Sequence, residues 1–107
     1  MAKRQITQED HDQVIEVHKG DLLTVQLPEN PTTGYRWNLD QHDPALLDLQ
    51  QTTFTPAGPG VGAGGGKQFV FVAKAPGMAE VLLNLRRHWE DKTAPTKSFK
   101  TRIHVTE

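Results

Sequence analysis

Three segments of the chain combine glycine, proline, threonine and aromatic residues in patterns suited to recognition. The first, Asn30-Pro31-Thr32-Thr33-Gly34-Tyr35, lies between two apolar segments with strand-like alternation. Pro31 restricts its own φ to about −65° and biases Asn30 toward an extended conformation, and Gly34 supplies a position where φ can be positive. The paired threonines are stiff at χ1 and present hydroxyl and methyl groups. A stiffened polar loop of this kind favours recognition over catalysis.

The second segment, residues 55–67, is rich in glycine and ends in Gly66-Lys67, as a phosphate-binding loop does. Such a loop also needs glycine where Val61 stands, Ser or Thr where Gln68 stands, and a helix after it rather than a strand. The phosphate-loop interpretation therefore fails. Two interpretations remain open: a floppy connection, or a loop whose bare backbone can come very close to the backbone of a partner.

The third segment, Arg86-Arg87-His88-Trp89-Glu90-Asp91, follows an apolar strand-like stretch. Trp89 is either a tryptophan at the rim that caps the core or an exposed aromatic anchor. Trp and Arg are the residues favoured for the second role, and the sequence leaves both interpretations open.

Nothing in the sequence indicates an enzyme active site or a metal centre. The five histidines lack ligand spacing and are interpreted as surface residues: His11, His18, His42, His88 and His104. No Ser, His and Asp combination is marked as activated, and the absence of cysteine excludes thiol nucleophiles, disulfides and thiolate metal sites. Asp40 and Asp43 are interpreted as turn residues. We expect no catalytic activity, no metal and no cofactor.

The charge balance argues against two classes of partner. The 107 residues include 12 Lys and Arg and 13 Asp and Glu, which gives a formal net charge of −1. We therefore expect neither nucleic acid nor a membrane as a partner, and no apolar run approaches the roughly 18 residues that span a bilayer. The start, Met1-Ala2-Lys3-Arg4, precedes no apolar stretch, so we expect no signal peptide in this chain. Removal of a leader would allow a periplasmic or secreted location; otherwise we expect a cytoplasmic one, and a monomer.

Seven short segments with alternating apolar and polar residues must position the three recognition segments. They cover residues 14–18, 22–27, 35–39, 46–54, 68–73, 79–87 and 98–105. The fourth is the least regular, because residues 45–49 could form a helical turn instead. Residues 1–12 are polar and aperiodic, and we expect a flexible lead-in there, followed by a single domain over residues 13–107.

Seven strands without a long helical pattern predict an all-β fold, an antiparallel β-sandwich of immunoglobulin-like type. The disulfide of antibody domains is absent, and Trp37 is the expected core aromatic. If successive strands alternate in direction, the connections after the second, fourth and sixth strands meet at one end. These connections are residues 28–34, 55–67 and 88–97, so the pattern predicts one site built from three loops.

The three segments, in this order, resemble the chagasin-type inhibitors of papain-like cysteine peptidases. That family carries Asn-Pro-Thr-Thr-Gly-aromatic, then Gly-x-Gly-Gly, then Arg-Pro-aromatic. The first motif is matched in full, and Gly62-Ala63-Gly64-Gly65 matches the second. Arg87-His88-Trp89 matches the third except at its centre, where His88 replaces proline. The resemblance spans most of residues 13–107.

The resemblance implies reversible, tight and competitive inhibition of a peptidase such as papain or a cathepsin-L-like enzyme. The threonine loop would enter the catalytic cleft and cover the active-site cysteine, while the other two loops grip the cleft on either side. Thr32, and secondarily Thr33, would fill the cleft without offering a scissile bond, and Trp89 would act as the aromatic anchor. Because His88 frees the third loop and adds a backbone N–H, we expect affinity that is weaker or dependent on pH.

The alternative is a non-inhibitory binding or adhesion module that uses the same three-loop end. Trp89 and Tyr35 would then stack on sugar rings, and replacement of Thr32 would have little effect. A structural or assembly domain is less favoured, because no strand carries an apolar outer face in addition to its inner one.

Overall fold

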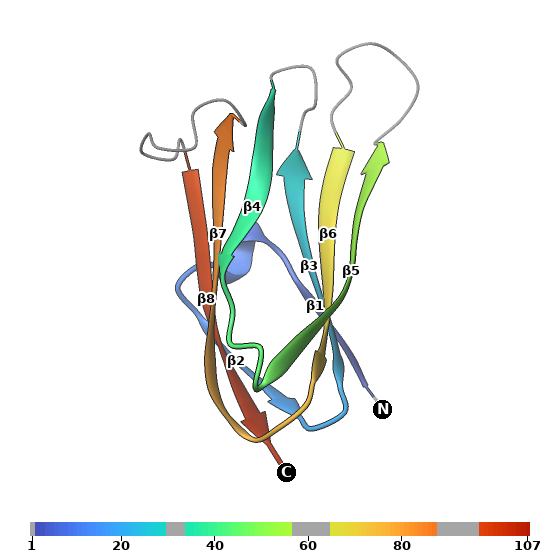
Figure 1. The fold of residues 1–107 in the computed structure, drawn as a ribbon, viewed down its shortest axis with the longest axis vertical. Coiled ribbons are helices and arrows are strands. Elements are labelled where there is room, and N and C mark those ends of the chain that lie inside the picture. The colour runs from blue at the N-terminus through green and yellow to red at the C-terminus, as the bar shows by residue number, and fades with distance from the viewer. Residues whose placement is uncertain (1, 30–33, 57–64, 88–96) are drawn as a thin grey trace.

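The structure is a computed structural model that describes residues 2–29, 34–56, 65–87 and 97–107. These ranges form eight strands and one short 3-10 helix, arranged as a sandwich of two four-stranded sheets (Figure 1). In chain order the elements are β1 (Lys3–Ile6), η1 (Gln8–Asp10), β2 (Val14–His18), β3 (Leu22–Glu29), β4 (Tyr35–Gln41), β5 (Leu47–Pro56), β6 (Gly65–Ala73), β7 (Gly77–Arg87) and β8 (Lys97–Thr106). The predicted all-β sandwich is confirmed.

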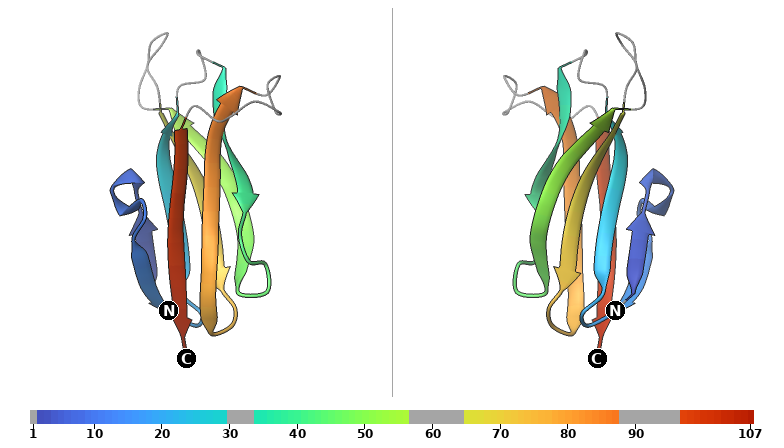
Figure 2. Two further views of the ribbon diagram at one scale, coloured as in Figure 1. Left: turned by 90° about the vertical axis from the view of Figure 1, so that its left-hand side faces the viewer. Right: turned by 90° about the vertical axis from the view of Figure 1, so that its right-hand side faces the viewer.

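The two sheets have the strand orders β1-β3-β6-β5 and β2-β8-β7-β4. Neighbouring strands are antiparallel except at one edge of each sheet, where β1 runs parallel to β3 and β2 runs parallel to β8. These edge strands, with η1 between them, lie along one side of the sandwich (Figure 2). Because the chain crosses through η1 from one sheet to the other, β1 and β2 are not joined by a hairpin, and each can pair in parallel.

The N-terminal segment corrects an expectation from the sequence. Residues 1–12 were expected to be a lead-in without regular structure, but β1 and η1 occupy much of this range, and the strands number eight rather than seven. Ile6 is fully buried and lies opposite Val25 of β3. The strand escapes detection because Ile6 is its only apolar residue, so no alternation is visible, and pairing to β3 holds it in place.

The core consists of the alternating residues that the sequence placed on the inner faces of the strands. Leu23, Val25 and Leu27 of β3 are buried, as are the inner residues of β6, β7 and β8. Trp37 is 5% exposed, which confirms it as a core aromatic. The core therefore fills the space between the sheets and leaves the ends of the sandwich to the connections.

The strand ends that flank the three recognition segments lie together at one end of the sandwich (Figure 1). In the pairing register, Gly65 lies opposite both Glu29 and Pro56, Tyr35 opposite Arg87, and Leu85 opposite Lys97. The first connection thus begins beside the end of the second and ends beside the start of the third. The prediction from strand parity is confirmed, and we call this region the loop end.

Candidate functional site

Thirteen residues were predicted to form the site, and the structure describes four of them: Gly34, Tyr35, Gly65 and the backbone of Arg87. The other nine lie outside the described residues: Asn30, Pro31, Thr32, Thr33, Gly62, Ala63, Gly64, His88 and Trp89. Both interpretations of Trp89 fall in this second group. The described part of the site therefore consists of the strand ends that carry the three segments.

The first segment re-enters the sandwich through a glycine in a left-handed conformation. Gly34 has φ of 81°, which confirms the expected positive φ and explains why a residue with a Cβ is disfavoured there. Tyr35 follows at once, is partly buried, and pairs in register with Arg87. The first and third segments are thus joined at their bases by the β4–β7 ladder.

Two hydrogen bonds close the base of the first segment. The backbone N–H of Trp37 donates to Glu29 Oε1 at 2.8 Å, and Trp37 Nε1 donates to the carbonyl oxygen of Pro28 at 2.9 Å. Both Glu29 and Trp37 are buried. Because β3 and β4 belong to different sheets, these bonds tie the sheets together where the loop begins and ends. We call this pair of bonds the Glu29–Trp37 clamp.

Glu29 was not among the predicted site residues, although the sequence carries a signal for its role. Glu29 continues the inward-facing series of Leu23, Val25 and Leu27, and a carboxylate on the core side of a strand must find a hydrogen-bond donor. The donor is the backbone N–H of an edge strand, because β4 lies at the edge of its sheet. The clamp thus satisfies a buried acceptor and an edge donor at once.

Packing within the chain disfavours a side chain at Gly65, the last residue of the predicted Gly-x-Gly-Gly match. A Cβ at this position would lie 2.6 Å from Phe54 Cζ and would also collide with the carbonyl oxygen of Thr55. Both obstacles belong to β5, the strand paired with β6 at this point. The close approach that Gly65 allows is therefore to its own neighbouring strand.

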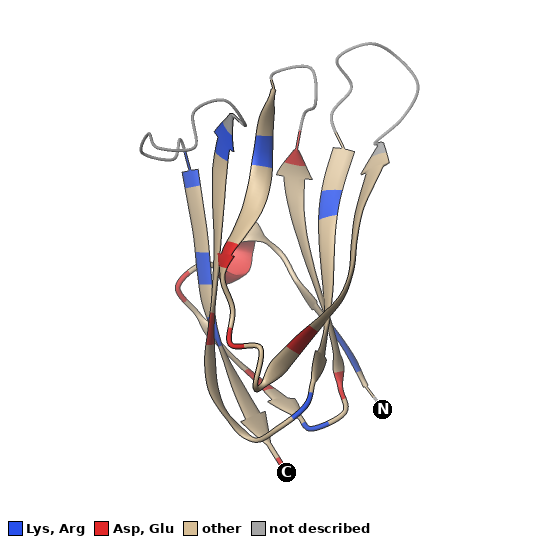
Figure 3. Ribbon diagram, viewed as in Figure 1, with Lys and Arg blue, Asp and Glu red and all other residues tan. Residues whose placement is uncertain are grey.

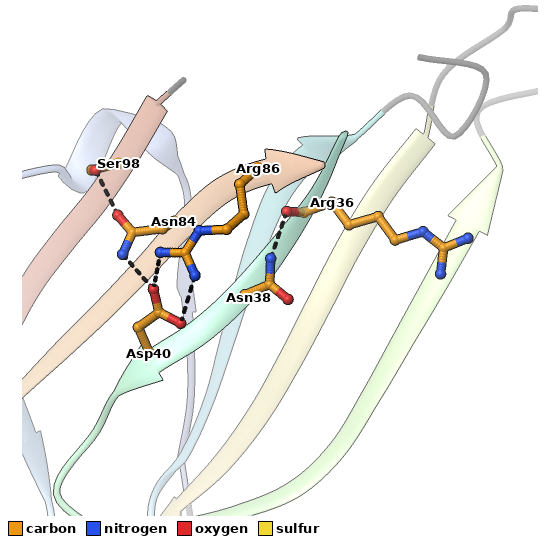
Figure 4. Close-up of polar contacts among 6 residues, drawn as sticks. All are labelled: Arg36, Asn38, Asp40, Asn84, Arg86 and Ser98. Atoms are coloured by element: carbon orange, nitrogen blue, oxygen red, sulfur yellow. Dashed lines mark hydrogen bonds and ion pairs between the residues drawn. The ribbon is translucent and has the colours of Figure 1, made fainter. Parts of the chain in front are cut away.

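A polar network on the outer face of the second sheet joins three strands below the first and third segments (Figure 4). Arg86 Nη2 lies 2.6 Å from Asp40 Oδ2, which also accepts a bond from Asn84 Nδ2 at 2.5 Å. Ser98 Oγ donates to Asn84 Oδ1 at 2.6 Å. Asp40 was expected in a turn, and this expectation is wrong: it lies in β4, where Arg86 of β7 compensates its charge.

Two features were sought among the described residues and not found there: a cluster of metal ligands and a membrane-spanning helix. Among them, no group of three or more His, Cys, Asp or Glu side chains is placed to hold a metal ion. In the same part of the chain, no helix has the length and apolar character needed to cross a bilayer.

Comparison with known proteins decides the family. The family model described as chagasin family peptidase inhibitor I42 matches residues 16–103, a range that includes all three recognition segments. The chain belongs to the chagasin family. The family resemblance inferred from the three motifs is thereby confirmed, and a member of this family is a protein inhibitor of peptidases rather than an enzyme.

Curated relatives match this chagasin-family chain over most of its length. Chagasin of Trypanosoma cruzi is 28% identical over 99 residues, which cover 88% of this chain and 90% of that protein. Amoebiasin-1 of Entamoeba histolytica is 27% identical over 101 residues, which cover 94% and 97% of the two chains. The family match thus extends to whole relatives of similar length.

Solved structures share the fold of this chagasin-family chain. The crystal structure of the cysteine protease inhibitor EhICP2 from Entamoeba histolytica superposes with a TM-score of 0.89 at 24% identity, covering 98% of this chain and 96% of that one. PbICP-C, solved in complex with falcipain-2, gives a TM-score of 0.63 at 18% identity over 98% and 90% of the two chains. At these identities the likeness concerns the fold.

Proposed function

We propose that this chain is a reversible, tight-binding, competitive inhibitor of papain-like cysteine peptidases, and that the thirteen predicted residues form the contact. The observation that carries the proposal is that the strand ends flanking the three motif-bearing segments lie together at one end of the sandwich. The family match supports the inhibitory activity, and the fold shared with EhICP2, a cysteine protease inhibitor, supports the class of peptidase.

The first segment acts as the wedge. Thr32, with Thr33 beside it, enters the catalytic cleft and covers the active-site cysteine without placing a scissile bond in substrate geometry. Pro31 limits the conformations open to the free loop, and the Glu29–Trp37 clamp fixes its base. Less conformational entropy is then lost on docking, which favours affinity.

The other two segments grip the cleft on either side of the wedge. Gly62 to Gly64 lack bulky side chains, so their backbone can approach the peptidase and pair with it in an extended manner. Trp89 supplies an aromatic anchor, and Arg87 orients it or reaches an acidic group on the rim. No covalent bond forms in this mechanism, so active peptidase is recovered when the complex dissociates.

A titration tests the proposal. Purified chain is added to papain and to a cathepsin-L-like peptidase, and hydrolysis of a fluorogenic peptide is followed at several substrate concentrations. We expect competitive inhibition at nanomolar concentration and a loss of affinity of about 100-fold or more for Thr32→Trp, because a bulky indole on the wedge obstructs its entry into the cleft, an effect as large as the loss of a hot spot. Thr32→Ala separates loss of contact from steric obstruction.

The matched control is Thr52→Ala, which removes an exposed threonine of β5 and leaves the three segments unchanged. It should inhibit as the wild type does. Absence of inhibition of both peptidases at micromolar wild-type protein would contradict the proposal. If neither Thr32 substitution changes the inhibition, the chain is still an inhibitor, but the threonine loop is not part of the contact.

A further inference from the structure

Charge is distributed unevenly along the sandwich of this nearly neutral protein. Residues 29–36, 55–67 and 86–97, which are the three connections and their flanking strand ends, contain six Lys and Arg against three Asp and Glu. The rest of the chain contains six Lys and Arg against ten Asp and Glu. On the ribbon, basic residues gather on strands at the loop end (Figure 3). The molecule therefore has a positive loop end and a negative body.

Three cations at the loop end lack a carboxylate partner within the described residues: Arg36, Lys67 and Lys97. Each lies within the first three residues of the strand that follows one of the connections, on β4, β6 and β8 respectively. Arg86, by contrast, is paired with Asp40 and contributes little net charge. We call the three unpaired cations the collar.

The collar residues differ in exposure. Arg36 and Lys97 are exposed. Lys67 is partly buried on the inward series of β6, and its Nζ lies 6.0 Å from the centre of the Phe69 ring, a cation–π contact. The one described acid at this end, Glu29, is buried and accepts the clamp hydrogen bond.

A positive end on a negative body selects and orients an anionic partner. Such a partner is attracted to the loop end and repelled by the remainder of the surface, so it meets the inhibitor in the orientation that binding needs. Complementary charge of this kind raises the association rate more than it lowers the dissociation rate, and salt screens it.

We propose that the collar recognises carboxylates around the active-site cleft of the target, so that the chain prefers papain-like peptidases with an acidic cleft rim. The inference rests on the proposed inhibitory function and adds to it the chemistry of the partner. The threonine loop blocks the cleft, and the collar attracts the acidic rim so that the loop docks there.

The test compares two triple variants with the same change in net charge. Arg36→Gln/Lys67→Gln/Lys97→Gln neutralises the collar, and Lys3→Gln/Lys19→Gln/Lys74→Gln neutralises three exposed lysines away from the loop end. Association and dissociation rates with a cathepsin-L-like peptidase are measured by stopped flow at ionic strengths from about 20 to 300 mM, across the range where screening becomes strong. Thermal unfolding of each variant confirms that it is folded.

We expect the collar variant to associate about 3- to 10-fold more slowly at low salt, with a flatter salt dependence and a dissociation rate that changes much less. The second variant should slow association much less than the collar variant, because its three lysines lie away from the loop end and act on the partner only through the net charge. Equal association rates for the two triple variants, with wild-type inhibition intact, would overturn the collar alone. Failure of the wild type to inhibit would overturn the proposed function and the collar with it.

Discussion

The two ends of the sandwich use their polar groups differently. At the end opposite the loop end, which we call the turn end, the short connections bond to one another. Gly20 N donates to the carbonyl oxygen of Ala73 at 2.8 Å, and Ala73 N donates to that of Asp21 at 3.0 Å. Lys74 N donates to the carbonyl oxygen of Leu46 at 2.7 Å, which brings in the β4–β5 connection. Backbone groups at the turn end are thus hydrogen-bonded to one another.

Among the described residues of the loop end, hydrogen bonds and an ion pair hold the bases of the connections. The Glu29–Trp37 clamp and the Asp40–Arg86 pair hold the strands, while the collar cations have no acidic partner in the described part of the chain. The difference predicts that stability and binding are separated along the long axis of the molecule. Substitutions at the turn end should lower stability and spare inhibition, whereas substitutions at the loop end should lower inhibition most.

The largest effect that would test this separation is expected at the clamp. Glu29→Ala leaves the buried N–H of Trp37 without an acceptor, at a cost of about 1–3 kcal/mol in the free energy of unfolding. The base of the first segment is also released, so we expect inhibition to weaken by about 10-fold, within the range of a lost positioning contact. Denaturant unfolding and the inhibition constant are measured on the same preparation.

Glu29→Gln is the matched control for the clamp. Its amide oxygen can still accept from Trp37, so inhibition should stay close to that of the wild type. If Glu29→Ala loses stability but its folded fraction inhibits with the wild-type constant, the clamp serves the fold and does not position the wedge.

A smaller effect, confined to acidic pH, is expected at the turn end. Hydrogen bonds from the backbone N–H groups of His18 and Ala2 hold the pKa of Asp21 below its ordinary value of 3.8. A carboxylate with a lowered folded pKa stabilises the fold above its unfolded pKa, and this stabilisation is lost as the pH falls through the folded value. The free energy of unfolding should therefore decrease below pH 3.8 partly through this group.

Asp21→Asn should remove that part of the acid dependence and leave inhibition at neutral pH unchanged. Denaturant unfolding from neutral pH to about pH 2 measures the first effect across the region where such a carboxyl titrates. A variant with the same acid dependence as the wild type would show that other carboxyl groups account for it. A change in inhibition would mean that the two ends are coupled.

The smallest effect is expected at His88, which stands where the family motif has proline. His88→Pro restricts the unbound segment, a change worth about 0.4–1 kcal/mol at a compatible position, so inhibition should strengthen a few-fold. The wild type should also vary between pH 5 and 8, where histidine titrates, while the variant should not. Inhibition constants are measured across this range, with His104→Gln as a control at a partly exposed histidine distant in sequence. Identical curves for wild type and His88→Pro would contradict a role for the imidazole.

Much of the fold could be predicted from local sequence, because strand side chains alternate with a period of two. The series Leu23, Val25 and Leu27 identified the buried face, and strand parity brought the three segments to one end. The least regular strand prediction, residues 46–54, corresponds to β5 at Leu47–Pro56, with a register shift between Leu49 and Gln51. A bulge of this kind interrupts alternation and weakens the signal.

The features that local sequence could not supply depend on contacts between distant residues. β1 has one apolar residue and exists through its pairing with β3. Asp40 is a strand residue because Arg86 and Asn84, more than forty positions away, surround its carboxylate. The sequence alone identifies neither partner of Asp40, since any basic or amide side chain on an outer face could bond to its carboxylate.

The sequence by itself determined the family, the sandwich and the meeting of three motifs at one end, because motif order and alternation are properties of the linear chain. The tertiary structure decided which groups hold those motifs in place. In the tertiary structure, Glu29 of one sheet accepts a hydrogen bond from Trp37 of the other, and packing against β5 disfavours a side chain at Gly65. Arg36 has no acidic neighbour in the described residues. These outcomes depend on register and on the distance between sheets, which only the packed core sets.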